Sequence, residues 1–138
     1  MDMKDGRLQA SDLMIGDWVD VNGHKEIVEQ IERYVLTTND WAYDWKESVI
    51  KPIPLTPEIL EKNGFVLEGY KYVLKYDHYV CVWVIFSTSD ERHSVIHIDD
   101  DRERIPTTYH NTINYAHELQ HALKLCKIEK LLNYESTR

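Results

Sequence analysis

The chain has few cysteines and no long hydrophobic run. Of its 138 residues only two are cysteine, Cys81 and Cys126, and no C-x-x-C spacing occurs. Neither a cysteine-rich zinc site nor a dithiol redox motif is therefore indicated, and both thiols are expected to be buried small apolar groups. The longest apolar run, residues 79–86, is far too short to cross a bilayer.

Basic residues are also scarce. The chain carries 16 Lys and Arg against 24 Asp and Glu, a formal net charge of −8. Because a phosphate backbone is bound by clustered cations, this balance argues against nucleic acid as a partner, and it would repel an anionic membrane surface. The polar N-terminus lacks the apolar stretch of a signal peptide. We therefore expect a cytoplasmic protein whose partner is another protein, with its oligomeric state left open.

The first half of the chain contains short β-prone segments separated by turns. Residues 13–21 predict a turn entering a strand, and the Asn22-Gly23 pair that follows is a strong hairpin signal. Residues 26–35 are then expected to form the returning strand, and residues 41–45 a third strand that runs on towards residue 50. Short twisted strands joined by tight turns predict a small twisted sheet or SH3-like barrel over residues 12–54.

The second half predicts an antiparallel sheet with two helices. Thr56 is a good N-cap and Pro57 suits the first helical position, so a short helix is expected over residues 57–62. Strands are predicted within 65–67, 70–76, 79–87 and 94–98, and the nearly all-apolar segment 80–86 is expected to be the central one. The last helix is predicted over residues 109–126, capped by Thr107 or Thr108.

Together these elements predict an α+β fold. A small twisted sheet or SH3-like barrel comes first, then a short helix, and then an antiparallel sheet covered by a C-terminal helix. Residues 1–11 are predicted to be a flexible tail, 12–126 a single domain, and 127–138 a C-terminal tail. Within the domain, residues 12–54 form the small β subdomain and residues 55–126 the sheet with its helices. A domain of this length buries a sufficient core without a structural metal.

The strongest chemical signal is the segment from His117 to His121, which spells H-E-x-x-H. Positions i and i+4 of a helix share one face, so His117 and His121 could bind one Zn²⁺ ion there. Glu118 would then act as general base on a metal-bound water. This motif indicates a zinc-dependent hydrolase.

The surroundings of the motif argue against a metal. The apolar stripe of the predicted helix excludes both histidines, which fall on a polar, solvated face. A catalytic zinc needs a third protein ligand, and Lys127 stands where the extended motif requires histidine. Glu129 or Glu135 could serve as a downstream ligand, but only 17 residues follow His121, which leaves little chain for the second helix that usually returns such a ligand. Upstream, His93, His97 or Asp99 could approach only through the fold. We therefore expect no cofactor, with zinc as the alternative.

Three segments carry a family resemblance. Residues 13–19 read Leu-Met-Ile-Gly-Asp-Trp-Val, residues 50–56 read Ile-Lys-Pro-Ile-Pro-Leu-Thr, and residues 115–121 read Tyr-Ala-His-Glu-Leu-Gln-His. They resemble the Leu-x-Ile-Gly-Asn-Tyr-Val, Pro-Ile-Pro-Leu-Thr and Tyr-Val-His-Gln-Leu-Gln-Asn segments of a family of small uncharacterised proteins. That family is common in Bacteroides and related bacteria, often among prophage-like or mobile genes. The resemblance implies a phage or mobile-element origin, and it places Gln and Asn at the positions of Glu118 and His121.

The aromatic residues offer a second kind of site. Four Trp and nine Tyr are present, and most are expected to pack within the sheets. On the small barrel, Trp41, Tyr43 and Trp45 are the candidate binding residues, because exposed rings there could grip a peptide. Their acidic neighbours disfavour a nucleic-acid strand. The predicted function is a non-enzymatic interaction module, and the alternative is a zinc-dependent hydrolase.

Overall fold

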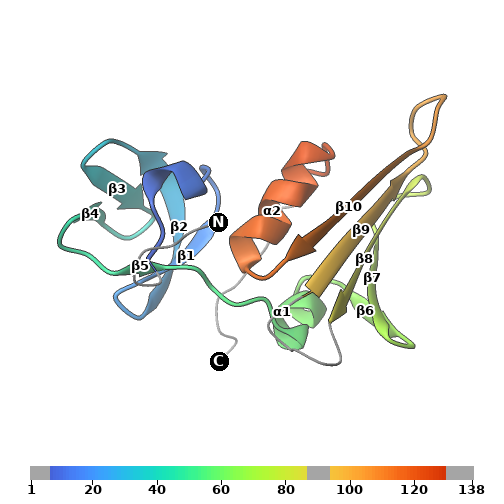
Figure 1. Ribbon diagram of the computed structural model, residues 1–138, viewed down its shortest axis with the longest axis horizontal. Helices are drawn as coiled ribbons and strands as arrows, with labels where there is room; N and C mark the ends of the chain where they lie inside the picture. Colours follow the sequence, from blue (N-terminus) through green and yellow to red (C-terminus); the bar gives the residue numbers. More distant parts are fainter. Residues whose placement is uncertain (1–6, 87–93, 130–138) are drawn as a thin grey trace.

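The computed structural model describes residues 7–86 and 94–129, which form two antiparallel sheets with a helix between them (Figure 1). The N-terminal sheet has five strands in the order β4-β3-β2-β1-β5. Its strands are β1 (Trp18–Val21), β2 (His24–Ile31), β3 (Val35–Thr38), β4 (Ala42–Asp44) and β5 (Ile50–Lys51).

The turns of the N-terminal sheet follow the sequence signals. Asn22 and Gly23 both have positive φ, 51° and 93°, which a two-residue hairpin of the primed type requires, so the predicted hairpin is confirmed. The third strand is also present, as β4, but it does not run on towards residue 50. A turn separates the two segments, and Ile50 instead pairs with Val21 of β1.

The small core of this sheet reaches further towards the N-terminus than predicted. Leu8 is buried with Val19, Val21 and Leu36, and its N–H donates to the Ile50 carbonyl at 2.8 Å. Leu8, within the segment 1–11 that is predicted to be a flexible tail, is therefore part of this core. Residues 1–6 lie outside the described residues.

The first helix, which follows the segment of residues 52–56, forms where the sequence predicts it. Helix α1 spans Pro57–Lys62, and the hydroxyl of Thr56 accepts the N–H of Ile59 at 3.3 Å, as an N-cap does. Gly64 follows with φ of 90°, a left-handed conformation that ends the helix. The predicted helix over residues 57–62 is confirmed.

The C-terminal sheet also has five antiparallel strands, in the order β10-β9-β8-β7-β6. Strand β8 lies at its centre, as its apolar composition predicts. The strands are β6 (Val66–Glu68), β7 (Lys71–Lys75), β8 (Val80–Phe86), β9 (Ser94–Asp100) and β10 (Thr107–Ile113).

The last helix starts later than predicted. Residues 107–113 pair along their whole length with β9, and helix α2 covers only Ala116–Leu125. β-branched side chains favour a strand here. The helix begins where the Glu118 carboxylate, in its first turn, accepts the backbone N–H groups of the preceding residues Asn114 and Tyr115. The predicted caps, Thr107 and Thr108, are wrong, since both are the first residues of β10.

Helix α2 lies between the two sheets (Figure 1). On one side Leu119 and Leu123 are fully buried in the main core, together with residues of β8 and β9. Trp18 of β1 also packs in this core. The predicted α+β fold, with a C-terminal helix over an antiparallel sheet, is therefore confirmed by the two sheets and the position of α2. Beyond α2, Ile128, within the segment 127–138 that is predicted to be a C-terminal tail, is also buried in this core; residues 130–138 lie outside the described residues. No helix in the described ranges is long and apolar enough to cross a membrane.

Candidate functional site

The H-E-x-x-H segment occupies the first two turns of α2, and its surroundings are not those predicted. His117 has none of its surface exposed, and Gln120 only 1%. The expected solvated face is therefore wrong. A helical wheel separates apolar from polar positions, but it cannot show that a second sheet packs on the polar side. Here the turn that leads into β1 contacts that side.

A buried carboxylate connects this turn to the helix. Asp17 is fully buried, and its Oδ2 lies 2.6 Å from Nε2 of His121. The same oxygen accepts the N–H of Met14 at 2.7 Å. One turn further along α2, the ammonium of Lys124 donates to the Ile15 carbonyl. His121 and Lys124 therefore attach the helix to the N-terminal sheet.

His117 lies deeper in the same joint. Its ring stacks with Tyr115 at 5.9 Å between centroids and meets the His121 ring edge-on at 5.4 Å. Within the described residues, both His117 ring nitrogens and Oδ1 of Asp17 are buried without a hydrogen-bond partner. Burial lowers the pKa of His117 from its ordinary value; His121 adds to the lowering, while Glu118 and the aspartates Asp17 and Asp12 oppose it. His117 is thus neutral at neutral pH.

Glu118 is occupied at the start of the helix. Its Oε1 accepts the backbone N–H groups of Asn114 and Tyr115, each at 3.0 Å. These bonds satisfy donors at the start of α2 that have no partner within the helix. The carboxylate that the motif would use as general base therefore acts as a helix cap.

The candidate third ligands that the structure describes, His97, Asp99 and Glu129, do not join the two histidines at a metal position. His97 and Asp99 bond to each other at 2.9 Å on the face of the C-terminal sheet that points away from α2. Glu129 donates its backbone N–H to the Tyr76 hydroxyl. His93 and Glu135 lie outside the described residues. In the part of the chain that the structure describes, no three His, Cys, Asp or Glu side chains converge on one metal position.

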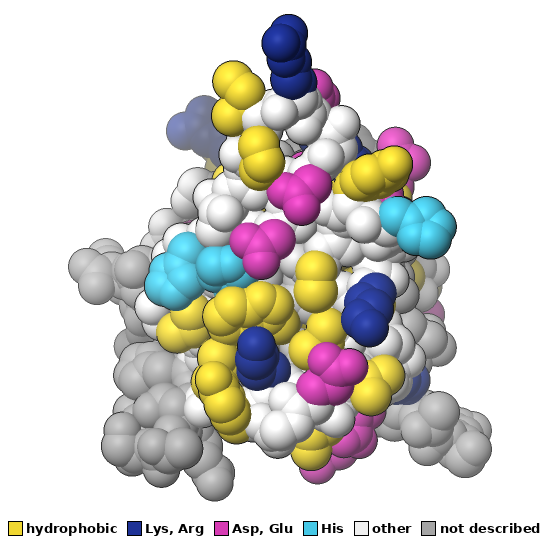
Figure 2. All heavy atoms as spheres, turned by 90° about the vertical axis from the view of Figure 1, so that its right-hand side faces the viewer, with side chains coloured by type: hydrophobic (Ala, Val, Ile, Leu, Met, Phe, Trp, Pro, Cys, Tyr) yellow, Lys and Arg dark blue, Asp and Glu magenta, His cyan; other side chains and the backbone are white. Residues whose placement is uncertain are grey.

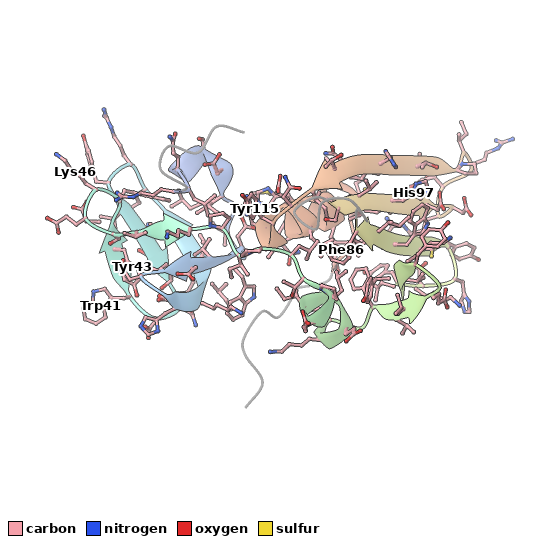
Figure 3. All side chains as sticks on the ribbon, turned by 60° about the horizontal axis from the view of Figure 1, so that its bottom comes forward. Trp41, Tyr43, Lys46, Phe86, His97 and Tyr115 are labelled. Carbon is pink, nitrogen blue, oxygen red and sulfur yellow. The ribbon has the colours of Figure 1, made fainter. Side chains whose placement is uncertain are left out.

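The three aromatic candidates of the N-terminal sheet have different environments. Trp41 is 69% exposed and points away from the sheet (Figure 3). The Tyr43 hydroxyl donates to the buried Glu26 carboxylate at 2.8 Å, and burial together with Glu26 raises the pKa of Tyr43 to about 12. The indole of Trp45 donates to the Glu32 carbonyl at 3.0 Å. Of the three rings only Trp41 projects into solvent, while the other two pack against the small core.

The C-terminal sheet carries a larger aromatic and apolar surface. Its inner side chains, such as Val82 and Ile96, are buried under α2, so their sequence neighbours point to the opposite side. We call that side the outer face. One row crosses all five strands of this face in register, and the residues of the row are Val66, Val73, Trp83, His97 and His110.

The rings of this row contact one another. Trp83 and His97 stack with centroids 4.3 Å apart and planes 16° apart, and His110 meets His97 edge-on at 5.9 Å. The ammonium of Lys71 lies 4.8 Å from the centre of the Trp83 ring, a cation–π distance. Ile85 and Val95 form the next pair across β8 and β9. On this face His110 and Val66 are exposed and Val73 is buried. Between them lies a partly exposed aromatic and aliphatic strip, formed by Trp83, His97, Ile85 and Val95.

The charge of the outer face differs from that of the chain. Its strand residues include two lysines, Lys71 and Lys75, and two acids, Glu68 and Asp99, which sum to zero, whereas the whole chain carries −8. Figure 2 shows apolar side chains gathered on this side of the molecule, with charges of both signs among them. The all-apolar composition of β8 was the sequence signal for this surface, since only one side of a strand can face one core.

A cavity of about 500 Å³ lies between the C-terminal end of α2 and strands β9 and β10. Arg102 at its edge donates to the Asp100 carboxylate at 2.7 Å and to the Cys126 carbonyl at 2.6 Å. The Arg102 guanidinium lowers the pKa of Asp100. These contacts hold the end of the helix, where free carbonyls attract a cation, and they pair the Arg102 guanidinium with the Asp100 carboxylate.

Comparisons with protein families, with curated proteins and with solved structures found no match for this chain. The family resemblance of residues 13–19, 50–56 and 115–121 stays a prediction.

Proposed function

We propose that this protein is a non-enzymatic, cytoplasmic interaction module that binds another protein through the outer face of its C-terminal sheet. The observation that carries this proposal is the aromatic strip of Trp83, His97 and His110, with the Ile85–Val95 pair beside it.

The composition of the central strand supports this function. An antiparallel sheet with one wet face normally alternates apolar and polar residues. Strand β8 instead directs Cys81, Trp83 and Ile85 outward, opposite to the core residues Val82 and Val84. Contiguous apolar and aromatic surface with few uncompensated charges is typical of protein–protein interfaces. Because the face is locally neutral, it adds no charge repulsion at the contact itself, although the whole chain carries −8.

The proposal also includes an SH3-like barrel for the N-terminal sheet and an origin of the protein in a phage or mobile element. An SH3-like barrel for the N-terminal sheet is supported by the position of β5 beside β1 and by the register shift between Val28 and Gln30, because such a bulge bends a strand. An origin in a phage or mobile element rests on the family resemblance alone.

The zinc-dependent hydrolase is a second candidate on one observation, the two buried His117 nitrogens without a partner. It is the weaker candidate, because Glu118 caps the helix and no third ligand converges on the histidines among the described residues.

Affinity purification of three tagged chains from host cells tests the proposal. The double variant Ile85→Thr/Val95→Thr removes apolar surface from the outer face but keeps β-branched side chains. Trp41→Thr is the matched control, since it removes an exposed ring from the other sheet. We expect a partner that the wild-type and Trp41→Thr chains retain equally and that the double variant loses at least about tenfold, or roughly 1.4 kcal/mol of binding. Equal retention by the double variant, or loss with Trp41→Thr alone, would overturn the assignment.

A further inference from the structure

Strand β10 is an unusually unprotected sheet edge. Proteins normally guard an edge strand with charges, proline, bulges or short length. Residues 105–117 contain no Asp, Glu, Lys or Arg, in a chain in which 29% of residues are charged. Strand β10 is seven residues long, pairs with β9 without a register shift, and exposes Thr108, His110 and Thr112.

The other edges of the described sheets differ from this one. Strands β4 and β6 have three residues each and end in Asp44 and Glu68. Strand β5 has two residues, and its Ile50 carbonyl already accepts the N–H of Leu8. Of the four described edges, only β10 combines length, regularity and lack of charge.

The neighbouring hydrogen bonds show which backbone groups of β10 face the free edge. Just beyond β10, the Asn114 carbonyl accepts the N–H of Leu55 at 3.1 Å, and the N–H of Ala116 donates to Ile53 at 2.8 Å. The segment of residues 53–55 therefore lies along the side of the chain that points away from β9. It runs beside residues 114–116 and extends no further along β10 than Asn114. Backbone direction alternates along a strand, so Thr108, His110 and Thr112 direct their N–H and C=O groups to that same side. In the described part of the chain, no strand pairs with them there.

The free edge is complementary to itself. An antiparallel pairing centred on His110 sets His110 opposite His110 of a second copy, and Thr108 opposite Thr112 of that copy. The Thr112 N–H donates to Oδ1 of Asn111 at 2.9 Å, and pairing exchanges this local bond for one to the second copy. The outward N–H and C=O groups then meet as donor and acceptor, and Thr–Thr cross-strand pairs are favourable. No charges oppose each other along the strand, although each chain carries −8.

We propose that two copies of this chain pair through β10, so that two five-stranded sheets form one continuous sheet about a twofold axis at His110. Strand addition at an open edge is a common mode of association, and a twofold interface uses the same patch of both copies. The inference does not rest on the proposed function. Its consequence is that the two outer faces join at their His110 ends and present a doubled binding surface.

Sedimentation of the full chain measures dimerisation, and variants that place like or opposite charges across the proposed axis test the pairing. We expect the wild type to dimerise and Thr108→Lys/Thr112→Lys to weaken the dimer at least about tenfold, because lysines then face each other across the axis. Thr108→Lys/Thr112→Glu is the matched control; it sets Lys opposite Glu and should restore the dimer. A wild type that stays monomeric up to about 1 mM, or a dimer insensitive to the double lysine variant, would overturn the proposal.

Disulfide trapping keeps the proposal testable if the lysine variants fail to fold. Directly opposed, hydrogen-bonded residues have Cα atoms about 5.5 Å apart, within the range that a disulfide spans. His110→Cys should therefore form a covalent dimer under mild oxidation. Thr112→Cys, two residues along the same strand, should not, because its counterpart in the second copy lies four positions away. Equal cross-linking of both variants, or none with His110→Cys, would contradict the twofold register.

Discussion

The two sheets of this protein have the same number of strands, but they differ in how much of their faces and edges is left open. The N-terminal sheet is short and bulged, its edges are two or three residues long, and Leu8 and Leu13 close its core. The C-terminal sheet has longer central strands, covers one face with α2, and leaves a neutral aromatic face and an uncharged edge open. Both proposed binding surfaces therefore lie in the second half of the chain, whereas the first half contacts the polar side of helix α2.

Helix α2 shows the same contrast on its two sides. Towards the C-terminal sheet it buries leucines, whereas towards the N-terminal sheet it buries His117 and bonds His121 to Asp17. The following experiments compare how much each side of the helix contributes to the stability of the fold.

The largest effect is expected from the apolar side. Leu119 is fully buried in the main core, so Leu119→Ala should lower the free energy of unfolding by about 3 kcal/mol, as cavity-forming substitutions do. Leu125 on the same helix is 69% exposed, and Leu125→Ala should change it by less than about 0.5 kcal/mol. Urea denaturation measures both. Similar losses for the two variants would contradict the assigned orientation of the helix.

The polar side is expected to contribute less. His121→Ala removes the partner of a fully buried carboxylate, so it should cost about 2 kcal/mol in the same urea experiment. His78→Ala, in an exposed turn, is the matched control and should have almost no effect. If His121→Ala is as harmless as the control, the Asp17–His121 contact does not hold the sheets together.

Acid should weaken the joint between the sheets through His117. Burial lowers its pKa in the folded protein, so the unfolded chain binds more protons below the ordinary value of 6.5. The stability that depends on neutral His117 is therefore fully present above pH 6.5. It is lost as pH falls through the lowered pKa of the folded protein, with the free energy of unfolding declining by up to about 1.4 kcal/mol per pH unit. Urea denaturation across this range should show a steeper decline for the wild type than for His117→Phe. Parallel curves would exclude His117 as the cause.

The smallest effect is expected from zinc. With Glu118 used as a cap and His121 bonded to Asp17, protein purified without added metal should contain almost no zinc by elemental analysis. Incubation with zinc followed by desalting should leave both the metal content and the melting temperature unchanged. One zinc ion per chain that is lost in His117→Phe would favour the hydrolase.

Local signals predicted much of the fold. Asn22-Gly23 produced its hairpin, Thr56-Pro57 started its helix, and the apolar run 80–86 became the central strand. Each of these features depends on neighbours in sequence. Residues 109–113 were predicted to be the start of the last helix, whereas pairing with the distant strand β9 selects a strand there.

The candidate site was harder to predict, because it depends on contacts between distant segments. The wheel placed His117 correctly on the polar side of α2, yet that side is buried by residues about a hundred positions away, through contacts such as Asp17–His121. Trp41 is exposed as expected, whereas Tyr43 found the buried Glu26. The aromatic strip of the outer face depends on the register of five strands, which pattern alone does not fix.

Site-specific photo-cross-linking in host cells tests the central claim, that the C-terminal sheet carries the interaction. Val66 on the outer face and Trp41 beside the N-terminal sheet are similarly exposed, 61% and 69%. A photoreactive residue at each position therefore samples the two sheets at equal accessibility. The account predicts a defined protein adduct from position 66 and none from position 41; an adduct from position 41 alone would contradict it.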